Sequence, residues 1–369
     1  MKILVIFGTR PEAIKLAPLI NRLRENSLFE VKVCNTGQHK DLIIPILNLF
    51  KLSIDYELNC MEINQGLTGL TCKIITKLDS LFNSYKPDYI IVHGDTTTSF
   101  ASALASFYAG IKIIHVEAGL RTYNKKSPFP EEINRTLTGS LADLHFAPTE
   151  TSKNNLIAEG KTENIYVTGN TVIDALYDAL KLIDENSYEI KNLKSKIDVT
   201  KKIILFTGHR RENFGDGFEN IFESIKNLTL SRNDIQLIYP VHPNPNVKSV
   251  AQNYFKDNKN VLLIEPLDYS TFIWLLNKSY LVITDSGGIQ EEAPSLGKPV
   301  LVIRDTTERP EAVEAGTVIL VGSNKVDLLH NANLLLDDVR FYNQMSSIIN
   351  PYGDGLASER IIDILMTLK

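Results

Sequence analysis

Apolar, β-branched runs alternate with amphipathic segments along this 369-residue chain, and this alternation most constrains its fold. The segments between the runs have the periodicity of helices that bury one face. Such a pattern predicts a doubly wound α/β structure with a buried parallel sheet. In the first half, strands are expected at residues 3–6, 31–34, 89–92, 111–115 and 165–167, and helices at 12–25, 67–85 and 99–109.

The alternation stops near the middle of the chain and then restarts. Residues 184–198 are polar and rich in lysine, which is typical of a linker. We therefore expect two Rossmann-like domains, residues 1–170 and 171–352, that face each other across a ligand-binding cleft. Strands of the second domain are expected at residues 203–206, 237–239, 261–264, 281–283, 300–303 and 318–320.

Charge and cysteine content exclude several function classes. The net charge is −5 and no basic run is present, which argues against nucleic acid and against a membrane surface as partners. Cys34, Cys60 and Cys72 have no paired metal-ligand spacing, so reduced thiols and no metal site are expected. The N-terminal apolar run is too short for a signal sequence. A soluble, cytoplasmic protein is expected.

The segment 280–297 predicts a strand, a glycine turn and a short helix that starts near residue 289. Gly287 and Gly288 would let the backbone approach a ligand, and the free N–H groups of the first helical turn suit a phosphate. Glu291 and Glu292, in the first turn of this helix, could then accept hydrogen bonds from sugar hydroxyls, which favours a nucleotide. In the alternative, Ser286 merely caps the helix and the glutamates offset its dipole.

Two basic residues follow the first expected strand. Arg10 and Lys15 lie at the start of a helix, where both could contact an anion. The alternative is that they pair with Glu12 at the surface. No G-x-G-x-x-G sequence follows this strand or a later one, which removes the usual dinucleotide fingerprint.

Three carboxylates are expected at one edge of the first sheet. Asp95 and Glu117 follow two of the strands, and Glu131 begins a helix with Arg135 one turn further on. Singly, Asp95 could be a helix cap and Glu131 a surface ion-pair partner. Together, their mutual repulsion would raise the pKa of at least one carboxyl group, as a proton-transfer site requires.

The second domain carries charged residues after its strands as well. His209, with Arg210 and Arg211, follows the strand at 203–206. The histidine could exchange a proton near neutral pH, and the arginines could neutralise a leaving diphosphate. Arg309 follows another strand and would lie near the glycine turn.

These motifs together resemble one family, the bacterial non-hydrolysing UDP-N-acetylglucosamine 2-epimerases. The resemblance covers nearly the whole chain, and the order of its blocks is specific. It implies a GT-B fold whose final helix, residues 358–369, returns to the first domain, a homodimer, and no redox cofactor or metal. The blocks are GTRPEAIKLAP, HGDTTT, HVEAGLRT, PFPEEINR, TGHRREN, DSGGIQEEAPSLGKPVL, RDTTERPEA and NPYGDGLAS.

The same resemblance implies roles for individual residues. The catalytic set would be Asp95, Glu117, Glu131 and His209. UDP and the sugar would be held by Arg10, Lys15, Arg135, Phe272, Ser286, Gly287, Gly288, Glu292 and Arg309, with Phe272 beside the uracil. A second, activating UDP-GlcNAc site would comprise Gln38, His39, Gln65, Glu131 and Arg210. Leu267 departs from the family, because many relatives have glutamine there.

The implied reaction is reversible epimerisation of UDP-GlcNAc to UDP-ManNAc at C2, which would supply ManNAc for a surface polysaccharide. It would proceed by elimination of UDP to 2-acetamidoglucal and re-addition. Two faces of C2 require two proton-transfer groups, which suits several carboxylates. The alternatives are a hydrolysing epimerase, an epimerase of a related UDP-sugar, a GT-B glycosyltransferase and a non-catalytic nucleotide-sugar sensor.

Overall fold

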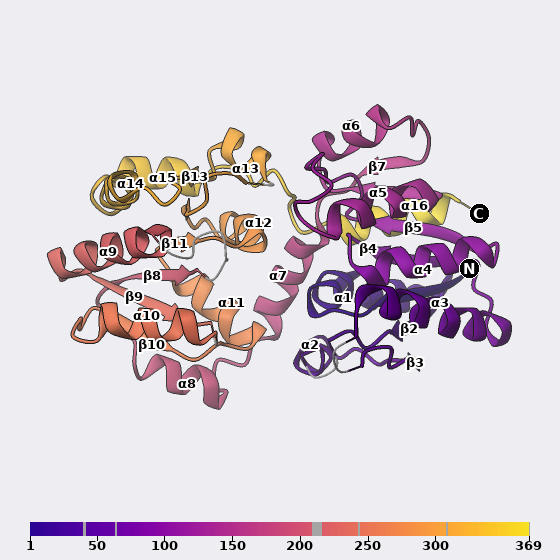
Figure 1. Ribbon diagram of the computed structural model, residues 1–369, viewed down its shortest axis with the longest axis horizontal. Coiled ribbons are helices and arrows are strands. Elements are labelled where there is room, and N and C mark those ends of the chain that lie inside the picture. Colours follow the sequence, from indigo (N-terminus) through magenta and orange to yellow (C-terminus); the bar gives the residue numbers. More distant parts are fainter. Residues whose placement is uncertain (40–41, 63–64, 209–215, 243, 308, 369) are drawn as a thin grey trace. The chain divides into compact units, whose positions relative to one another are not determined.

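The computed structural model describes residues 1–39, 42–62, 65–208, 216–242, 244–307 and 309–368. The chain divides into two compact units, and each has helices layered on a parallel sheet (Figure 1). Unit 1 is Met1–Leu182 with Tyr352–Lys369, and unit 2 is Ile183–Pro351.

The sheet of unit 1 has seven parallel strands in the order β3-β2-β1-β4-β5-β6-β7. Its central strands are buried, which explains why they read as continuous apolar runs in the sequence. The strand order reverses between β1 and β4, so the loops after these two strands diverge at one edge of the sheet. The strands are β1 (Lys2–Phe7), β2 (Glu30–Asn35), β3 (Tyr56–Glu57), β4 (Tyr89–His93), β5 (Lys112–Val116), β6 (Leu144–Ala147) and β7 (Ile165–Val167).

The helices of unit 1 cover this sheet, and the last of them comes from the far end of the chain. Helix α16 packs on α1 and α7, so the C-terminal segment returns to the first unit as expected. The helices are α1 (Arg10–Glu25), α2 (Ile44–Phe50), α3 (Leu67–Ser84), α4 (Thr97–Tyr108), α5 (Glu131–Leu141), α6 (Glu150–Ala158), α7 (Thr171–Leu182) and α16 (Ala357–Thr367).

Unit 2 repeats this architecture with six parallel strands in the order β10-β9-β8-β11-β12-β13. Its order reverses between β8 and β11. The strands are β8 (Lys202–Thr207), β9 (Ile235–Pro240), β10 (Val261–Ile264), β11 (Leu281–Thr284), β12 (Val300–Val302) and β13 (Val318–Leu320). The helices are α8 (Tyr188–Lys194), α9 (Asp216–Ser231), α10 (Pro245–Phe255), α11 (Tyr269–Lys278), α12 (Gly287–Ser295), α13 (Pro310–Ala315), α14 (Lys325–Asp337) and α15 (Val339–Ser346).

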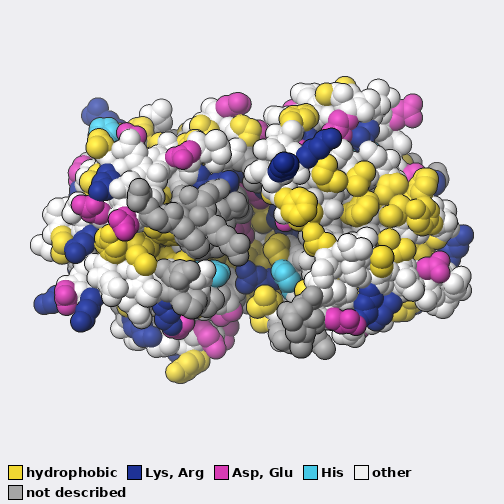
Figure 2. Space-filling model, in the orientation of Figure 1, with side chains coloured by type: hydrophobic (Ala, Val, Ile, Leu, Met, Phe, Trp, Pro, Cys, Tyr) yellow, Lys and Arg dark blue, Asp and Glu magenta, His cyan; other side chains and the backbone are white. Residues whose placement is uncertain are grey.

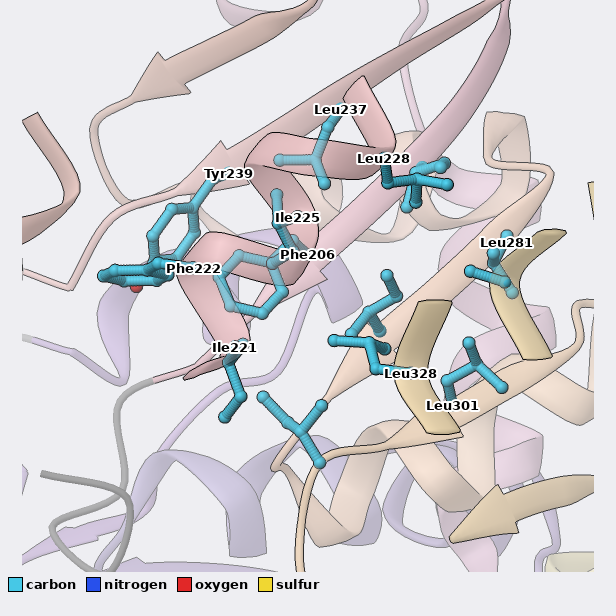
Figure 3. Packing of buried hydrophobic residues seen from close by; sticks show 14 of the residues in the cluster. Phe206, Ile221, Phe222, Ile225, Leu228, Leu237, Tyr239, Leu281, Leu301 and Leu328 are labelled. Atoms are coloured by element: carbon cyan, nitrogen blue, oxygen red, sulfur yellow. The ribbon is translucent and has the colours of Figure 1, made fainter. Parts of the chain in front are cut away.

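Aromatic side chains fill part of the core of unit 2. Phe206, Phe222 and Tyr239 pack against one another, with ring centroids 4.5 to 6.1 Å apart (Figure 3). The buried Tyr239 hydroxyl donates a hydrogen bond of 2.7 Å to the carbonyl oxygen of Gly208. This bond satisfies a buried polar group and holds the chain just beyond β8.

The expected α/β architecture is confirmed, and the differences have local causes. Strands β3, of two residues, and β6, of four residues, were not predicted. The expected linker contains helix α8, whose Ile190 and Leu193 are buried. Helix α7 belongs to unit 1, whereas the sequence analysis placed residues 171–182 in the second domain; α7 buries an apolar face and packs on α1. Among the described residues, no helix has the length and apolar character needed to span a membrane.

Candidate functional site

The turn after β1 is held by the buried carboxylate of Glu12. Thr9 caps α1 in a capping box with Glu12, whose Oε2 accepts from the N–H groups of Gly8 and Thr9 at 3.1 and 2.8 Å. Its other oxygen accepts from the hydroxyls of Thr96 and Ser99, at 2.7 and 3.0 Å. Burial raises the pKa of Glu12, although these hydrogen bonds oppose the shift. Glu12 therefore ties the turn after β1 to the turn after β4.

Glu117 lies in a second buried carboxylate site, just beyond β5. Its backbone is left-handed, with φ of 61°, which is uncommon for a residue with a side chain. Lys15 donates a hydrogen bond to Oε2 of Glu117, and Asn170 Nδ2 donates to the same oxygen at 2.9 Å. His93 Nε2 lies 3.7 Å from it. Lys15 thus pairs with Glu117, and the alternative that it pairs with Glu12 is wrong.

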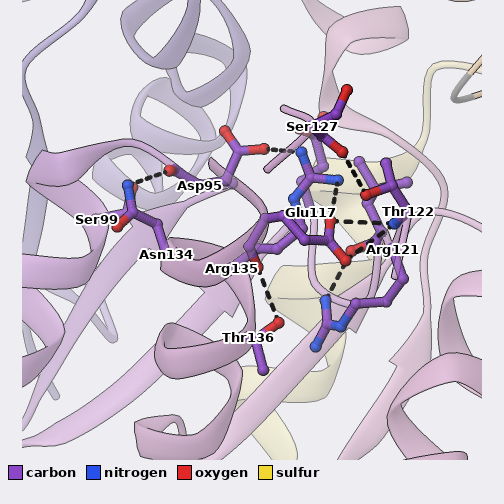
Figure 4. A network of polar contacts seen from close by, with 12 residues as sticks. Asp95, Ser99, Glu117, Arg121, Thr122, Ser127, Asn134, Arg135 and Thr136 are labelled. Carbon is purple, nitrogen blue, oxygen red and sulfur yellow. Dashed lines mark hydrogen bonds and ion pairs between the residues drawn. The ribbon is translucent and has the colours of Figure 1, made fainter. Parts of the chain in front are cut away.

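Asp95 follows β4 and is paired with a cation of its own. Arg135 Nη2 donates to Oδ2 of Asp95, and Asn134 Nδ2 donates to its backbone carbonyl at 3.0 Å (Figure 4). Burial raises the pKa of Asp95, Arg135 opposes that shift, and the charge of Glu117 adds to it. The expected rise of a carboxyl pKa is thus present, but desolvation contributes more to it than repulsion does.

The two adjacent glutamates at the start of α5 have different environments. Glu131, the predicted catalytic residue, is half-buried at the first position of the helix. Glu132 is buried and accepts from the N–H groups of Thr122 and Tyr123 at 3.0 and 2.8 Å. It also lies 3.5 Å from Arg135 Nη1. The sequence analysis missed Glu132, which fixes the loop after β5 against the helix that carries Arg135.

Three buried histidines, His93, His115 and His145, lie on the neighbouring strands β4, β5 and β6. Burial lowers the pKa of His93 and of His145 to about 4 and that of His115 to about 3, so all three are neutral at pH 7. His115 Nε2 lies 2.8 Å from the carbonyl oxygen of Gly94. A carbonyl only accepts, so Nε2 carries the proton in this bond. His115 therefore fixes the turn that leads into Asp95.

Three of the residues predicted for a second nucleotide-sugar site, Gln38, His39 and Gln65, lie at two places in unit 1, and Glu131 begins α5. His39 Nδ1 accepts from the backbone N–H of Arg10 at 3.3 Å, and the side chain of Arg10 is exposed. Gln38 Oε1 accepts from the Thr98 hydroxyl at 3.1 Å. Gln65 precedes α3 and accepts from the N–H of Glu62 at 2.8 Å. Arg210, like the predicted catalytic residue His209, lies outside the described residues.

The glycine turn of unit 2 opens helix α12 two residues earlier than expected, at Gly287. Ser286 is the N-cap residue, but its side chain makes no capping hydrogen bond. A Cβ at Gly288 would meet no atom of the described residues within 4 Å, and one at Gly287 would lie 4.0 Å from Arg309 Nη2. Packing against the described residues therefore does not require glycine at position 288, whereas a ligand that approaches the backbone would.

Charged and aromatic side chains surround this turn. Arg309 Nε donates to Oε1 of the fully buried Glu291. Tyr269 is the first residue of α11, and its hydroxyl donates a hydrogen bond of 3.2 Å to Oε1 of Glu292. Phe272 lies on the same helix, one turn on, and is half-buried. Two residues of α12 are thus contacted by side chains from elsewhere in unit 2, Glu291 by the guanidinium of Arg309 and Glu292 by the hydroxyl of Tyr269.

Two doubly wound parallel sheets, with charged side chains at the strand ends of each switch point, define a two-domain α/β enzyme of the GT-B class. The family model of UDP-N-acetylglucosamine 2-epimerase matches residues 21–366. The chain belongs to this family of isomerases.

Individual relatives agree along their whole length. A UDP-N-acetylglucosamine 2-epimerase of Campylobacter jejuni is 53% identical over 375 residues, which cover 100% of this chain and 98% of the relative. The enzyme of Neisseria meningitidis, solved with UDP-GlcNAc bound, superposes with a TM-score of 0.90 at 49% identity and covers 100% of both chains. An S. aureus protein solved with UDP superposes with a TM-score of 0.88 at 48% identity, over 100% of this chain and 96% of that one.

Proposed function

We propose that the protein interconverts UDP-GlcNAc and UDP-ManNAc by inverting the configuration at C2. The observation that carries this proposal is the arrangement of Asp95 and Glu117. They follow the neighbouring strands β4 and β5, and each is hydrogen-bonded to a cation of its own. Two separately paired carboxyl groups suit a reaction that moves a proton on two faces of one carbon.

The C2 hydrogen of the substrate has no adjacent carbonyl, so a base alone would remove it too slowly. In the proposed step a carboxylate takes the C2 proton while the electron pair of that C–H bond forms the C1–C2 double bond. The C1–O bond breaks, and UDP leaves with its electron pair. Protonation of 2-acetamidoglucal on the other face of C2, with attack of the UDP oxygen on C1, gives UDP-ManNAc. The sequence is redox-neutral, so it needs no oxidant or reductant.

The roles follow from the charges at each site. Asp95, Glu117 and Glu131 would transfer the C2 proton, and Lys15 and Arg135 would hold two of these carboxylates and contact the sugar. The diphosphate would bind at Ser286, Gly287 and Gly288, the N-terminus of α12, together with Arg309 and Arg10. Glu292 would accept from the ribose hydroxyls and Phe272 would lie on the uracil. His209 would stabilise the leaving group.

A second bound UDP-GlcNAc is proposed to activate the enzyme through Gln38, His39, Gln65 and Arg210. Gln38 and His39 lie beside the N-terminus of α1, from which Lys15 reaches Glu117. The test is the time course with UDP-ManNAc as the sole substrate. A lag that UDP-GlcNAc abolishes is expected, whereas full initial velocity on UDP-ManNAc alone would exclude this activation.

A homodimer is proposed from an exposed apolar face on α4 and α5. Phe107 and Tyr108 at the end of α4 are 58% and 72% exposed, and Leu137 on α5 is 40% exposed. Figure 2 shows hydrophobic side chains gathered in the part of the view that these helices occupy in Figure 1. Large exposed apolar patches are typical of protein interfaces. Tyr108→Lys is expected to halve the mass measured by light scattering, and an unchanged mass would place the interface elsewhere.

The proposed setting is the cytoplasm, where the UDP-ManNAc formed would supply a surface polysaccharide. The proposed activity is tested by incubating UDP-GlcNAc with the purified protein, without an added nicotinamide cofactor, and by separating sugar nucleotides from free sugars. UDP-ManNAc with its diphosphate linkage intact is expected. Free ManNAc with UDP would indicate a hydrolysing enzyme, and turnover only with an added acceptor would indicate a glycosyltransferase.

A further inference from the structure

We propose that Asn170 is a positioning residue for the carboxylate of Glu117, a role that rests on the proposed function of Glu117 in proton transfer. Asn170 is buried, with 2% of its surface exposed, between β7 and α7. Its Nδ2 donates a hydrogen bond of 2.9 Å to Glu117 Oε2, across 53 residues of chain.

The orientation of the Asn170 amide is determined by its other hydrogen bond. Oδ1 accepts from the N–H of Val172 at 3.0 Å, in the first turn of α7. An N–H group only donates, so the oxygen of the amide must face Val172 and the NH2 group must face Glu117. The helix start therefore selects the rotamer of Asn170 that presents a donor to the carboxylate.

The backbone of Asn170 is fixed by the returning C-terminal segment. Its N–H donates to the carbonyl oxygen of Tyr352 at 2.7 Å, and Tyr352 is fully buried. Gly169 and Gly353 lie against each other here, because a Cβ on Gly353 would be 3.4 Å from the Cα of Gly169 and 3.5 Å from the Asn170 nitrogen. Both glycines have positive φ, at 90° and 132°. The chain crossing thus leaves Asn170 little freedom to move.

Three groups near Oε2 of Glu117 differ in how rigidly they are held. Lys15 supplies a charge and a donor at the end of a flexible chain, and His93 Nε2, at 3.7 Å, is beyond hydrogen-bond range of Glu117. The planar amide of Asn170, held at both ends, is the rigid donor of the set. We therefore assign it the task of aiming Glu117, and a displacement of about 1 Å in such a group can cost roughly 100-fold in rate.

Two substitutions separate positioning from folding. Asn170→Asp keeps an acceptor for Val172 but turns a carboxylate oxygen toward Glu117, so repulsion replaces the hydrogen bond. Asn170→Ser also keeps an acceptor but is too short to reach Glu117. Asn324→Ser is the control, because Asn324 caps α14 through the N–H groups of Val326 and Asp327 in unit 2. All three variants change the residue that caps a helix, and only the two at position 170 also remove the hydrogen bond to Glu117.

The experiment measures kcat and KM for UDP-GlcNAc, the dissociation constant of UDP, and thermal unfolding for the full-length proteins. For Asn170→Ser we expect kcat to fall about 10-fold or more, and for Asn170→Asp about 100-fold. UDP affinity should stay within about 2-fold, because the hydrogen bonds described for Asn170 are to Glu117, Val172 and Tyr352, none of which is assigned to the nucleotide. Asn324→Ser should retain the kcat of the wild type.

The pH dependence of kcat/KM provides a second test, because a substitution that affects only folding would leave it unchanged. Among the described residues, the charged and titratable groups that face Glu117 include Lys15 on α1, His93 on β4 and Asp95 beyond β4. Asn170→Asp adds a further negative charge, so the acidic limb of kcat/KM is expected at higher pH than in the wild type. Wild-type kcat in either Asn170 variant, or a loss that follows the unfolding temperature with an unmoved limb, would overturn the proposal. A wild type that does not epimerise UDP-GlcNAc would instead refute the proposed function.

Discussion

The Lys15 ammonium donates a hydrogen bond to Oε2 of Glu117, a residue 102 positions further along the chain. Both side chains are largely buried, with 13% and 8% exposed. A buried carboxylate needs such a partner, because desolvation of an unpaired charge is costly. The ammonium of Lys15 therefore offsets part of the cost of burying the Glu117 carboxylate.

Loss of either paired carboxylate is expected to stop the reaction without stopping nucleotide binding. Asp95→Asn and Glu117→Gln keep the shape of the side chain but remove its proton-transfer capacity, so kcat should fall about 100- to 10,000-fold. UDP affinity, measured by calorimetry, should be retained. Glu159→Gln is the matched control, because Glu159 also pairs with an arginine, Arg121, in unit 1. Equal activity losses in all three variants would mean that broken ion pairs, rather than proton transfer, explain the effect.

The two glutamates that begin α5 are expected to differ in what their loss changes. Glu132→Ala leaves the buried N–H groups of Thr122 and Tyr123 without their acceptor, which should cost about 1–3 kcal/mol of stability. Glu131→Gln should leave the unfolding free energy unchanged and lower kcat instead. Urea unfolding and steady-state kinetics of both variants provide the comparison. A stable Glu132→Ala protein would show that other contacts hold the loop.

The glycine turn of α12 is expected to tolerate a methyl group in folding but not in nucleotide binding. A Cβ at position 288 meets no atom of the described residues within 4 Å, and alanine favours a helix over glycine by about 0.5–1 kcal/mol. Gly288→Ala should therefore unfold at the same temperature or slightly higher. The methyl group would separate the diphosphate from the backbone, so the dissociation constant of UDP should rise about 10-fold or more. An unchanged affinity for UDP would show that the diphosphate does not bind at this turn.

The buried histidines are expected to make the stability of unit 1 depend on pH. The pKa of His145 falls to about 4 on folding, so between pH 6.5 and 4 the unfolded chain binds a proton that the folded chain does not. The contribution of His145 to the unfolding free energy is therefore fully present above pH 6.5. It decreases as the pH falls towards 4, by up to about 1.4 kcal/mol per pH unit. In His145→Phe, the slope of the unfolding free energy against pH, measured by urea unfolding, should be smaller by up to about 1.4 kcal/mol per pH unit. Parallel curves for the two proteins would contradict this account.

The sequence predicted the fold well where one physical signal dominated. Buried parallel strands such as Val300–Val302 are unbroken apolar runs, and the turn at Gly287 follows from two adjacent glycines after a strand. Helix α7 shows where that signal failed. Its amphipathic pattern fits either domain, and only its packing on α1 assigns it to unit 1.

Long-range partners could not be predicted from spacing. Glu12 and Lys15 are one turn apart on a helix, which suggested a local pair. Glu12 instead bonds to Thr96 and Ser99, and Lys15 reaches Glu117. Glu132 and Asn170 were missed for the same reason, because each acts on a group brought near only by the sheet topology. An asparagine just before a helix looks like an ordinary cap in the sequence.

The central claim is that the enzyme makes and breaks the C2–H bond of its substrate, and proton NMR in deuterated water tests it most directly. UDP-GlcNAc is incubated with the protein, and the C2 signals of both sugar nucleotides are followed. The account predicts UDP-ManNAc that carries deuterium at C2, with no such product from Glu117→Gln. UDP-ManNAc that keeps the original C2 hydrogen, or no change at C2 despite binding, would contradict it.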